Sequence, residues 1–185
     1  GTVPEDGPVL VTGSAGGVGS IAIMLLAKLG YSVTASTGRP ETAAYLKALG
    51  ASDIIARDDL ARKSKPLEKE IWAAVVDSVG STTLGTALAQ TKYNGVIAAC
   101  GLAAGLDMPT TVLPFILRNV RLQGCDSVMA PMNLRERAWD DLASLLDTSL
   151  LSEVYRIEPM SNIKSLASAI LRGEIKGRVV IDVNA

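Results

Sequence analysis

The chain has 185 residues, of which 48% are hydrophobic and 20% are charged, and it contains two cysteines and no histidine. Without an imidazole it cannot house a Ser-His-Asp triad, a Cys-His nucleophile pair or a His-containing zinc site, so reactivity would come from a cofactor or another polypeptide. The net charge of -1 gives the chain no excess of positive charge, so nucleic acids and anionic membranes are not expected as partners. The longest apolar run, 21–27, is too short to span a bilayer.

The two cysteines give a second general expectation. Cys100 closes an apolar run and Cys125 follows a strand-like one. We therefore expect both to be buried and reduced rather than bridged, which suits a cytoplasmic protein.

The first third of the chain alternates apolar β-rich segments with helix-like segments. Two of the helix-like segments end at Gly30 and Gly50, and glycine readily adopts the left-handed C-cap conformation that ends a helix. This alternation is typical of βαβ units. The expected strands are 8–13, 32–36 and 53–56, and the expected helices are 18–29 and 41–49.

The remainder continues the pattern after a charged stretch, 57–70, that we interpret as a solvated loop. The expected strands are 73–79, 95–101, 120–125 and 178–183, and two of the expected helices are 82–91 and 112–117. A third helix is expected to begin at a capping box of Asn133 and Glu136 and to end near residue 146. A fourth is expected to begin with Ser161 or Asn162 as its N-cap. We predict an α/β fold, a Rossmann-type doubly wound parallel sheet of about six strands, followed by a C-terminal helix and strand.

Residues 12–19, TGSAGGVG, lie directly between an expected strand and an expected helix. Glycines there let the backbone turn sharply and approach a pyrophosphate, while the free N–H groups and the dipole of the helix start stabilise its charge. The simpler alternative is a tight turn with no ligand. The surrounding βαβ pattern favours dinucleotide binding.

Two other nucleotide-binding classes are disfavoured, the P-loop proteins by the turn itself and the short-chain dehydrogenases by the residues that follow the tyrosines. A P-loop needs Lys and then Ser or Thr after its last glycine, whereas Gly19 is followed by Ser20 and Ile21. The glycines also match the TGxxxGxG pattern of short-chain dehydrogenases, which need a catalytic Tyr with Lys four residues later. The residues at that offset from the four tyrosines are Ala35, Leu49, Ile97 and Pro159.

The end of the second expected strand indicates which dinucleotide binds. NAD enzymes place an acidic residue there for the ribose 2′-hydroxyl, but this chain has Ser-Thr-Gly-Arg at 36–39. Hydroxyls beside Arg39 suit a 2′-phosphate, so we expect NADP(H) rather than NAD(H). Arg57, at the end of the third expected strand, either approaches the same phosphate or lies in the charged loop, and the sequence leaves both open.

Several segments together carry a family resemblance. They are VTG at 11–13, GGVGS at 16–20, KLGY at 28–31, LGAS at 49–52, ACGL at 99–102 and LPFILRNVRLQG at 113–124. The chain resembles the zinc-free, quinone oxidoreductase-like branch of the medium-chain dehydrogenase/reductase superfamily, and the acrylyl-CoA reductase family within it. The similarity runs nearly end to end.

The resemblance implies an NADPH-dependent oxidoreductase that reduces the carbon-carbon double bond of acryloyl-CoA to give propionyl-CoA, or that reduces a quinone. It implies no metal, leaves the catalytic residues unassigned, and places a cofactor against eleven residues. These are Ala15, Gly16, Gly17, Val18, Thr37, Gly38, Arg39, Arg57, Leu102, Ile116 and Ser127.

The resemblance also implies more protein than this chain. Family members carry an N-terminal GroES-like substrate domain, so we expect residues 5–155 to form the NADP-binding domain and 156–185 to pack on that missing domain. Family members pair their sixth strands across a two-fold axis, which implies a homodimer through 120–125, unless that segment is an ordinary edge strand. A non-catalytic NADP(H)-sensing module and a short-chain-type dehydrogenase remain the alternatives.

Overall fold

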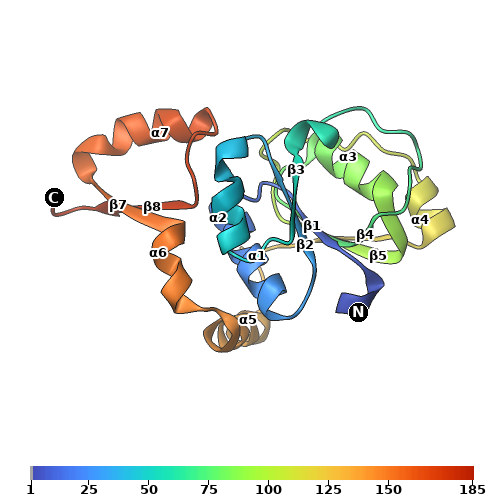
Figure 1. Cartoon of the computed structure of the whole chain (residues 1–185), viewed down its shortest axis with the longest axis horizontal. Coiled ribbons are helices and arrows are strands. Elements are labelled where there is room, and N and C mark those ends of the chain that lie inside the picture. The colour runs from blue at the N-terminus through green and yellow to red at the C-terminus, as the bar shows by residue number, and fades with distance from the viewer. Residues whose placement is uncertain (1) are drawn as a thin grey trace.

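The computed structural model describes residues 2–185, in which a six-stranded parallel sheet carries helices on both faces (Figure 1). The strand order is β3-β2-β1-β4-β5-β6, so the chain winds outward from β1 in one direction and then crosses back to start β4 on the other side. This is the Rossmann-type doubly wound fold that the sequence predicted. The strands are β1 (Val9–Val11), β2 (Val33–Thr37), β3 (Asp53–Ala56), β4 (Trp72–Asp77), β5 (Thr91–Ala99) and β6 (Arg121–Gly124).

The two faces of the sheet hold separate hydrophobic cores. On one face, Val11 and Val33 pack with Ile23 and Leu46 from α1 and α2, and on the other, strand residues pack against α3. Neighbouring β1 residues join different cores because successive side chains of a strand point to opposite faces. The helices are α1 (Gly17–Lys28), α2 (Ala43–Ala48), α3 (Ser81–Gln90), α4 (Leu113–Arg118), α5 (Met132–Leu145), α6 (Leu151–Val154) and α7 (Ile163–Leu171). None of these helices is both long and apolar enough to cross a membrane.

The C-terminal residues form a small unit of their own, drawn in orange and red at the left of Figure 1. β7 (Tyr155–Pro159) pairs in parallel with β8 (Arg178–Asp182), and α7 makes the crossover between them. The sequence predicted α7 and β8 but not β7. β7 alternates polar and apolar residues in only five positions and gives too weak a period to identify.

Several local expectations were wrong. α5 begins at Met132 after Pro131 and has no side-chain cap, so Asn133 and Glu136 form no capping box. Asn162 does stand at the start of α7, but its amide donates to Glu158 Oε2 at 2.9 Å instead of capping the helix.

The cysteines were also placed wrongly. Cys100 and Cys125 are free but exposed, because each follows the last residue of its strand, where the sheet opens to solvent. The apolar runs before them continue the buried strands, and the cysteines themselves lie beyond the core.

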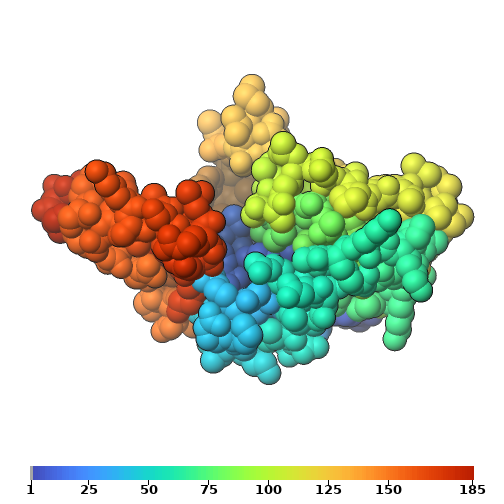
Figure 2. Space-filling model, turned by 90° about the horizontal axis from the view of Figure 1, so that it is seen from above, coloured from blue at the N-terminus to red at the C-terminus, as the bar shows by residue number. Residues whose placement is uncertain are grey.

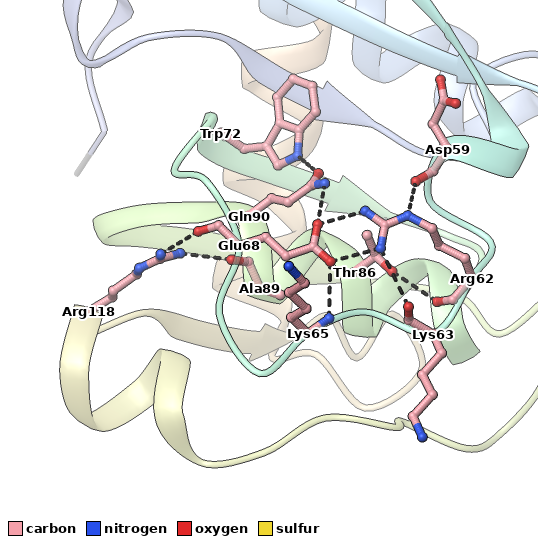
Figure 3. A network of polar contacts seen from close by, with 10 residues as sticks. All are labelled: Asp59, Arg62, Lys63, Lys65, Glu68, Trp72, Thr86, Ala89, Gln90 and Arg118. Carbon is pink, nitrogen blue, oxygen red and sulfur yellow. Dashed lines mark hydrogen bonds and ion pairs between the residues drawn. The ribbon is translucent and has the colours of Figure 1, made fainter.

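The charged stretch after β3 is more ordered than a plain solvated loop, as Figure 3 shows. Both oxygens of Glu68 accept from the Arg62 guanidinium, at 2.7 and 2.6 Å, and Oε2 also accepts from the Gln90 amide at 3.0 Å. Gln90 in turn accepts from the Trp72 indole at 2.9 Å. This network ties the loop to the end of α3 and to β4. The bonds to Arg62 and Gln90 lower the pKa of Glu68 to about 2.

We predict that Glu68→Gln lowers the free energy of unfolding by about 1–2 kcal/mol at neutral pH, a modest value because Arg62 is 42% exposed and solvent screens the pair. The folded pKa lies below the ordinary value, so the carboxylate's contribution is complete above about pH 4.5 and is lost as the pH falls toward 2. Urea unfolding at pH 7 and pH 3 should show the difference from the parent protein narrowing at pH 3. Exposed Glu136 on α5 provides the control, and an equal loss in Glu136→Gln would contradict the assignment.

Candidate functional site

A cavity of about 550 Å³ opens at the carboxyl edge of the sheet, beside the neighbouring strands β1 and β4, whose following connections run in opposite directions along the sheet. Doubly wound sheets bind their ligands at this switch point. In Figure 2, orange-red C-terminal residues and yellow-green residues face each other across a hollow whose floor is formed by blue N-terminal residues. The lining comprises residues 12–16 of the glycine turn, 36–39, 57 and 61, the β4–α3 turn at 78–79, 82–83, 103–104, and the C-terminal stretch 170–173 with 175.

Two glycines of the turn occupy positions that other residues would not tolerate. Gly13 has a φ of +59°, a conformation that L side chains rarely adopt. A Cβ on Gly19 would lie 2.5 Å from the Gly13 carbonyl oxygen and 2.6 Å from the Cα of Ser14. α1 therefore starts directly against the turn, and the free N–H groups of its first residues face the carboxyl edge of the sheet.

A buried carboxylate anchors this turn to the next one. Asp77, at the end of β4, is fully buried and accepts from the Thr12 hydroxyl at 2.7 Å and from the Gly80 N–H at 2.9 Å. The Thr12 hydroxyl also accepts from the Ser78 N–H at 3.2 Å. These bonds fix the β1–α1 and β4–α3 turns relative to each other, on opposite sides of the cavity.

The end of β2 brings the expected phosphate-binding residues together. The Thr37 hydroxyl accepts from the Arg39 N–H at 3.1 Å. The Arg57 guanidinium covers Gly38 so closely that a Cβ there would lie 2.6 Å from its central carbon. Arg39 and Arg57 both line the cavity, so Arg57 lies at the candidate site as well as at the start of the charged stretch.

The remaining expected residues lie around this cavity to different degrees. Ala15, Gly16, Thr37 and Gly38 line it, while Gly17 and Val18 form the first turn of α1 beside it. Leu102 lines a second, more open groove of about 460 Å³ at the ends of β5 and β6. Ser127 lies two residues after Cys125 of this groove, and Ile116 is an exposed residue of α4 that lines neither hollow.

The C-terminal segment contributes to this cavity in a way that was not predicted from the sequence. Gly177 donates to the Ala15 carbonyl at 2.8 Å, and Arg39 donates to the Ile175 carbonyl at 3.1 Å, so this segment closes one side of the cavity. The Arg178 guanidinium lies against Gly17 at the start of α1, 2.5 Å from where a Cβ would stand. Glycine at 177, before a basic residue and an apolar strand, was the available signal, but it does not indicate which part of the chain the segment contacts.

The electrostatics of the cavity favour an anion. Neither Arg39 nor Arg178 forms an ion pair within residues 2–185, and Arg57 has only Asp58 at 3.9 Å, with both side chains largely exposed. The start of α1 adds the positive end of a helix dipole. Arg39 and Arg57 on the cavity wall, with Arg178 beside the helix N-terminus, thus give this site an excess of positive charge, whereas Arg172 on the same wall is paired with Glu174 at 2.8 Å.

The chain is similar to known proteins over most of its length. The profile of the family described as zinc-binding dehydrogenase matches residues 17–144. The chain belongs to this family. It is 53% identical over 186 aligned positions to acrylyl-CoA reductase AcuI of Ruegeria pomeroyi, covering 100% of this chain and 56% of that protein.

Two solved structures are similar over almost the whole chain. The Escherichia coli K-12 YhdH structure with bound NADPH has a TM-score of 0.95 and 50% identity, over 99% of this chain and 56% of that one. The Bacillus subtilis YhfP structure with NAD bound has a TM-score of 0.91 and 44% identity, over 99% and 56%. YhfP is named a putative quinone oxidoreductase. The chain spans little more than half the length of these relatives.

The family description raises the question of zinc. The sequence has no histidine and two cysteines, and the described residues contain no group of three or more His, Cys, Asp or Glu side chains that could hold a metal ion. Structural and catalytic zinc sites need three or four such ligands. Residues 2–185 therefore do not by themselves supply the ligand set of a zinc ion.

We predict that Gly19→Ala lowers the free energy of unfolding by about 1–3 kcal/mol, because the added methyl group meets backbone atoms that cannot rotate away. Denaturant unfolding measures the loss. Gly124, at the end of β6, is the matched control: a Cβ added there would have nothing within 4 Å, so Gly124→Ala should be close to neutral. Equal stability of the two variants would contradict the packing described for the glycine turn.

Proposed function

We propose that this chain is the NADP(H)-binding portion of an oxidoreductase that transfers hydride to an activated carbon-carbon double bond, as in acryloyl-CoA, or to a quinone. The observation that carries the proposal is the single cavity that joins the glycine turn to Arg39 and Arg57. The names of AcuI and YhfP and the NADPH in YhdH support the same class of reaction.

The cavity suits the two charged parts of the dinucleotide. The pyrophosphate would lie over the start of α1, where free N–H groups and Arg178 offset its charge. The adenosine 2′-phosphate would lie at the end of β2, between Arg39 and Arg57 and beside the Thr37 hydroxyl. An acidic residue for a free ribose 2′-hydroxyl is missing there, which favours NADP(H), although the YhfP structure holds NAD.

Bound NADPH would supply the hydride at its nicotinamide ring. The family resemblance places that ring against Leu102, Ile116 and Ser127. Of these three residues, Leu102 lines the groove at the ends of β5 and β6. We assign this chain the tasks of binding and orientation. The catalytic residues would belong to the second half of the substrate cleft.

The second half would come from a GroES-like domain preceding this chain, on which residues 156–185 would pack. The exposed apolar residues of the C-terminal unit support that arrangement: Ile157, Ile163, Ile170 and Leu171 are 46–89% exposed. β6 is an edge strand with free pairing capacity, and we propose that it forms the interface of a zinc-free, cytoplasmic homodimer.

We predict that Arg39→Ala and Arg57→Ala each weaken NADPH binding by roughly tenfold to a hundredfold, because each removes a charge-assisted bond to the 2′-phosphate. NADH binding should be nearly unchanged. Calorimetric titration with both dinucleotides measures the difference, and Arg137→Ala on exposed α5 is the matched control. If NADH bound as tightly as NADPH to the parent protein, the phosphate assignment would be wrong.

We further predict that the full-length protein containing this chain oxidises NADPH in the presence of acryloyl-CoA and yields propionyl-CoA. A quinone, tested in parallel, distinguishes the two acceptor classes. NADPH absorbance and product analysis provide the measurement. NADPH binding without oxidation by either acceptor would favour a sensing module and contradict the proposed reaction.

A further inference from the structure

Cys100 and Cys125 directly follow the paired ends of two neighbouring strands. Ala99, the last residue of β5, is the register partner of Gly124, the last residue of β6, in a parallel pair. The Cys125 N–H donates to the Ala99 carbonyl at 2.9 Å, which closes this last register pair, and each cysteine is the next residue of its chain. The two cysteines thus leave adjacent strands side by side, where the strand spacing is about 5 Å. This spacing falls in the Cα range that a disulfide requires.

Both thiols are reachable from solvent. Each cysteine is free and exposed, and both line the open groove of about 460 Å³ at the ends of β5 and β6. The Cys100 Sγ donates to the Asp77 carbonyl at 3.2 Å, on the side away from β6. A thiol is a weak donor, so a rotation about χ1 of Cys100 can turn its sulfur toward Cys125.

We propose that Cys100 and Cys125 form an oxidisable thiol pair that a peroxide converts to an intrachain disulfide across the carboxyl ends of β5 and β6. A first thiolate attacks one peroxide oxygen; the S–O bond forms, the O–O bond breaks, and the released hydroxide takes up a proton to give water. The second sulfur then displaces the hydroxyl group of the sulfenic acid, so that the S–S bond forms and a second water leaves. Two thiols thus lose two electrons and two hydrogens while one peroxide becomes two waters.

The order of attack follows from the surroundings of the two sulfurs. Partial burial, together with the charges of Cys125 and Asp77, raises the pKa of the Cys100 thiol. The Cys100 sulfur is also held by its bond to the Asp77 carbonyl, so we assign the first attack on the peroxide to exposed Cys125. Cys100 then acts as the resolving thiol, for which proximity matters more than acidity.

The bridge would join two loops of the groove. Residues 100–102 follow β5 and residues 125–127 follow β6, so a bond between the sulfurs ties the Leu102 loop to the Ser127 loop. Any effect on the nicotinamide side rests on the proposed function. The disulfide itself needs no cofactor, so its test stands apart from the test of NADP(H) binding. An exposed bridge of this kind is of the labile, reducible class.

Peptide mapping tests the pair directly. The protein is treated with stoichiometric hydrogen peroxide without reductant, the remaining thiols are blocked, and the chain is digested with trypsin. Cleavage after Lys92, Arg118, Arg121 and Arg135 places Cys100 in peptide 93–118 and Cys125 in peptide 122–135. We expect these peptides to appear linked, with the loss of two hydrogens, and to separate on treatment with dithiothreitol. Exposed Met129 and Met132 can gain oxygen in the same treatment, but dithiothreitol does not reverse that change.

Four variants keep the outcome decisive. Cys100→Ser and Cys100→Ala should leave Cys125 as a trappable sulfenic acid, and Cys125→Ser and Cys125→Ala should abolish both the linked peptides and the fast reaction with peroxide. Thermal melting confirms that each variant is folded. The proposal is overturned if both parent thiols stay free, if both proceed to sulfinic acid without a link, or if the linked peptides occur only between two chains on a non-reducing gel.

Discussion

The close contact between the backbone of residue 19 and the carbonyl of Gly13 is the constraint on which the site depends. Because only a hydrogen fits there, α1 can begin immediately after β1, with its free N–H groups directed at the carboxyl edge of the sheet. One more methyl group would push the helix outward and disperse those donors. The same contact brings α1 close enough for Ile23 and Met24 to enter the core with β1 and β2. Packing and ligand binding thus share one requirement.

Asp77 extends this constraint to the opposite side of the cavity. A buried carboxylate normally destabilises a core unless its oxygens are bonded, and both of these accept hydrogen bonds from turn residues. The carboxylate therefore acts as a fixed spacer between the β1–α1 and β4–α3 turns. The width of the cavity is set by short polar bonds in the core and not by the exposed charges at its mouth.

Local patterns were enough to predict the βαβ order and the glycine turn. Apolar runs bounded by glycines identify parallel strands and their helices because each such element is buried along its length. Residues 15–18 and 37–39 lie one short step from those elements, so their positions followed from the strand ends. The sequence left Arg57 undecided because charge alone does not separate a site residue from a solvated one. The structure places its guanidinium against Gly38, beside Arg39 at the cavity.

The sequence could not predict that the C-terminal segment folds back onto the start of α1. The Gly177 contact with Ala15 and the position of Arg178 against Gly17 join residues about 160 positions apart, and no local period encodes such a pairing. β7 was missed for a related reason, since its partner β8 follows only after a whole helix. The cysteines show the converse error: two correctly identified strands were extended past their ends, by two residues at β5 and one at β6, so both cysteines were expected to be buried.

The return of the C-terminal segment couples anion binding to folding. Arg39 and Arg178 lie where their positive charges add to the dipole of α1, an arrangement that is unfavourable until a negative charge enters the cavity. Arg39 also bonds the Ile175 carbonyl and so connects the end of β2 to the C-terminal segment. The 2′-phosphate and the pyrophosphate of a bound dinucleotide would offset the positive charge at these two contacts. Any ligand that binds only the folded state stabilises it by mass action, and here that stabilisation would act first on the docking of the C-terminal unit. A dinucleotide in the cavity would therefore also hold the segment that closes it.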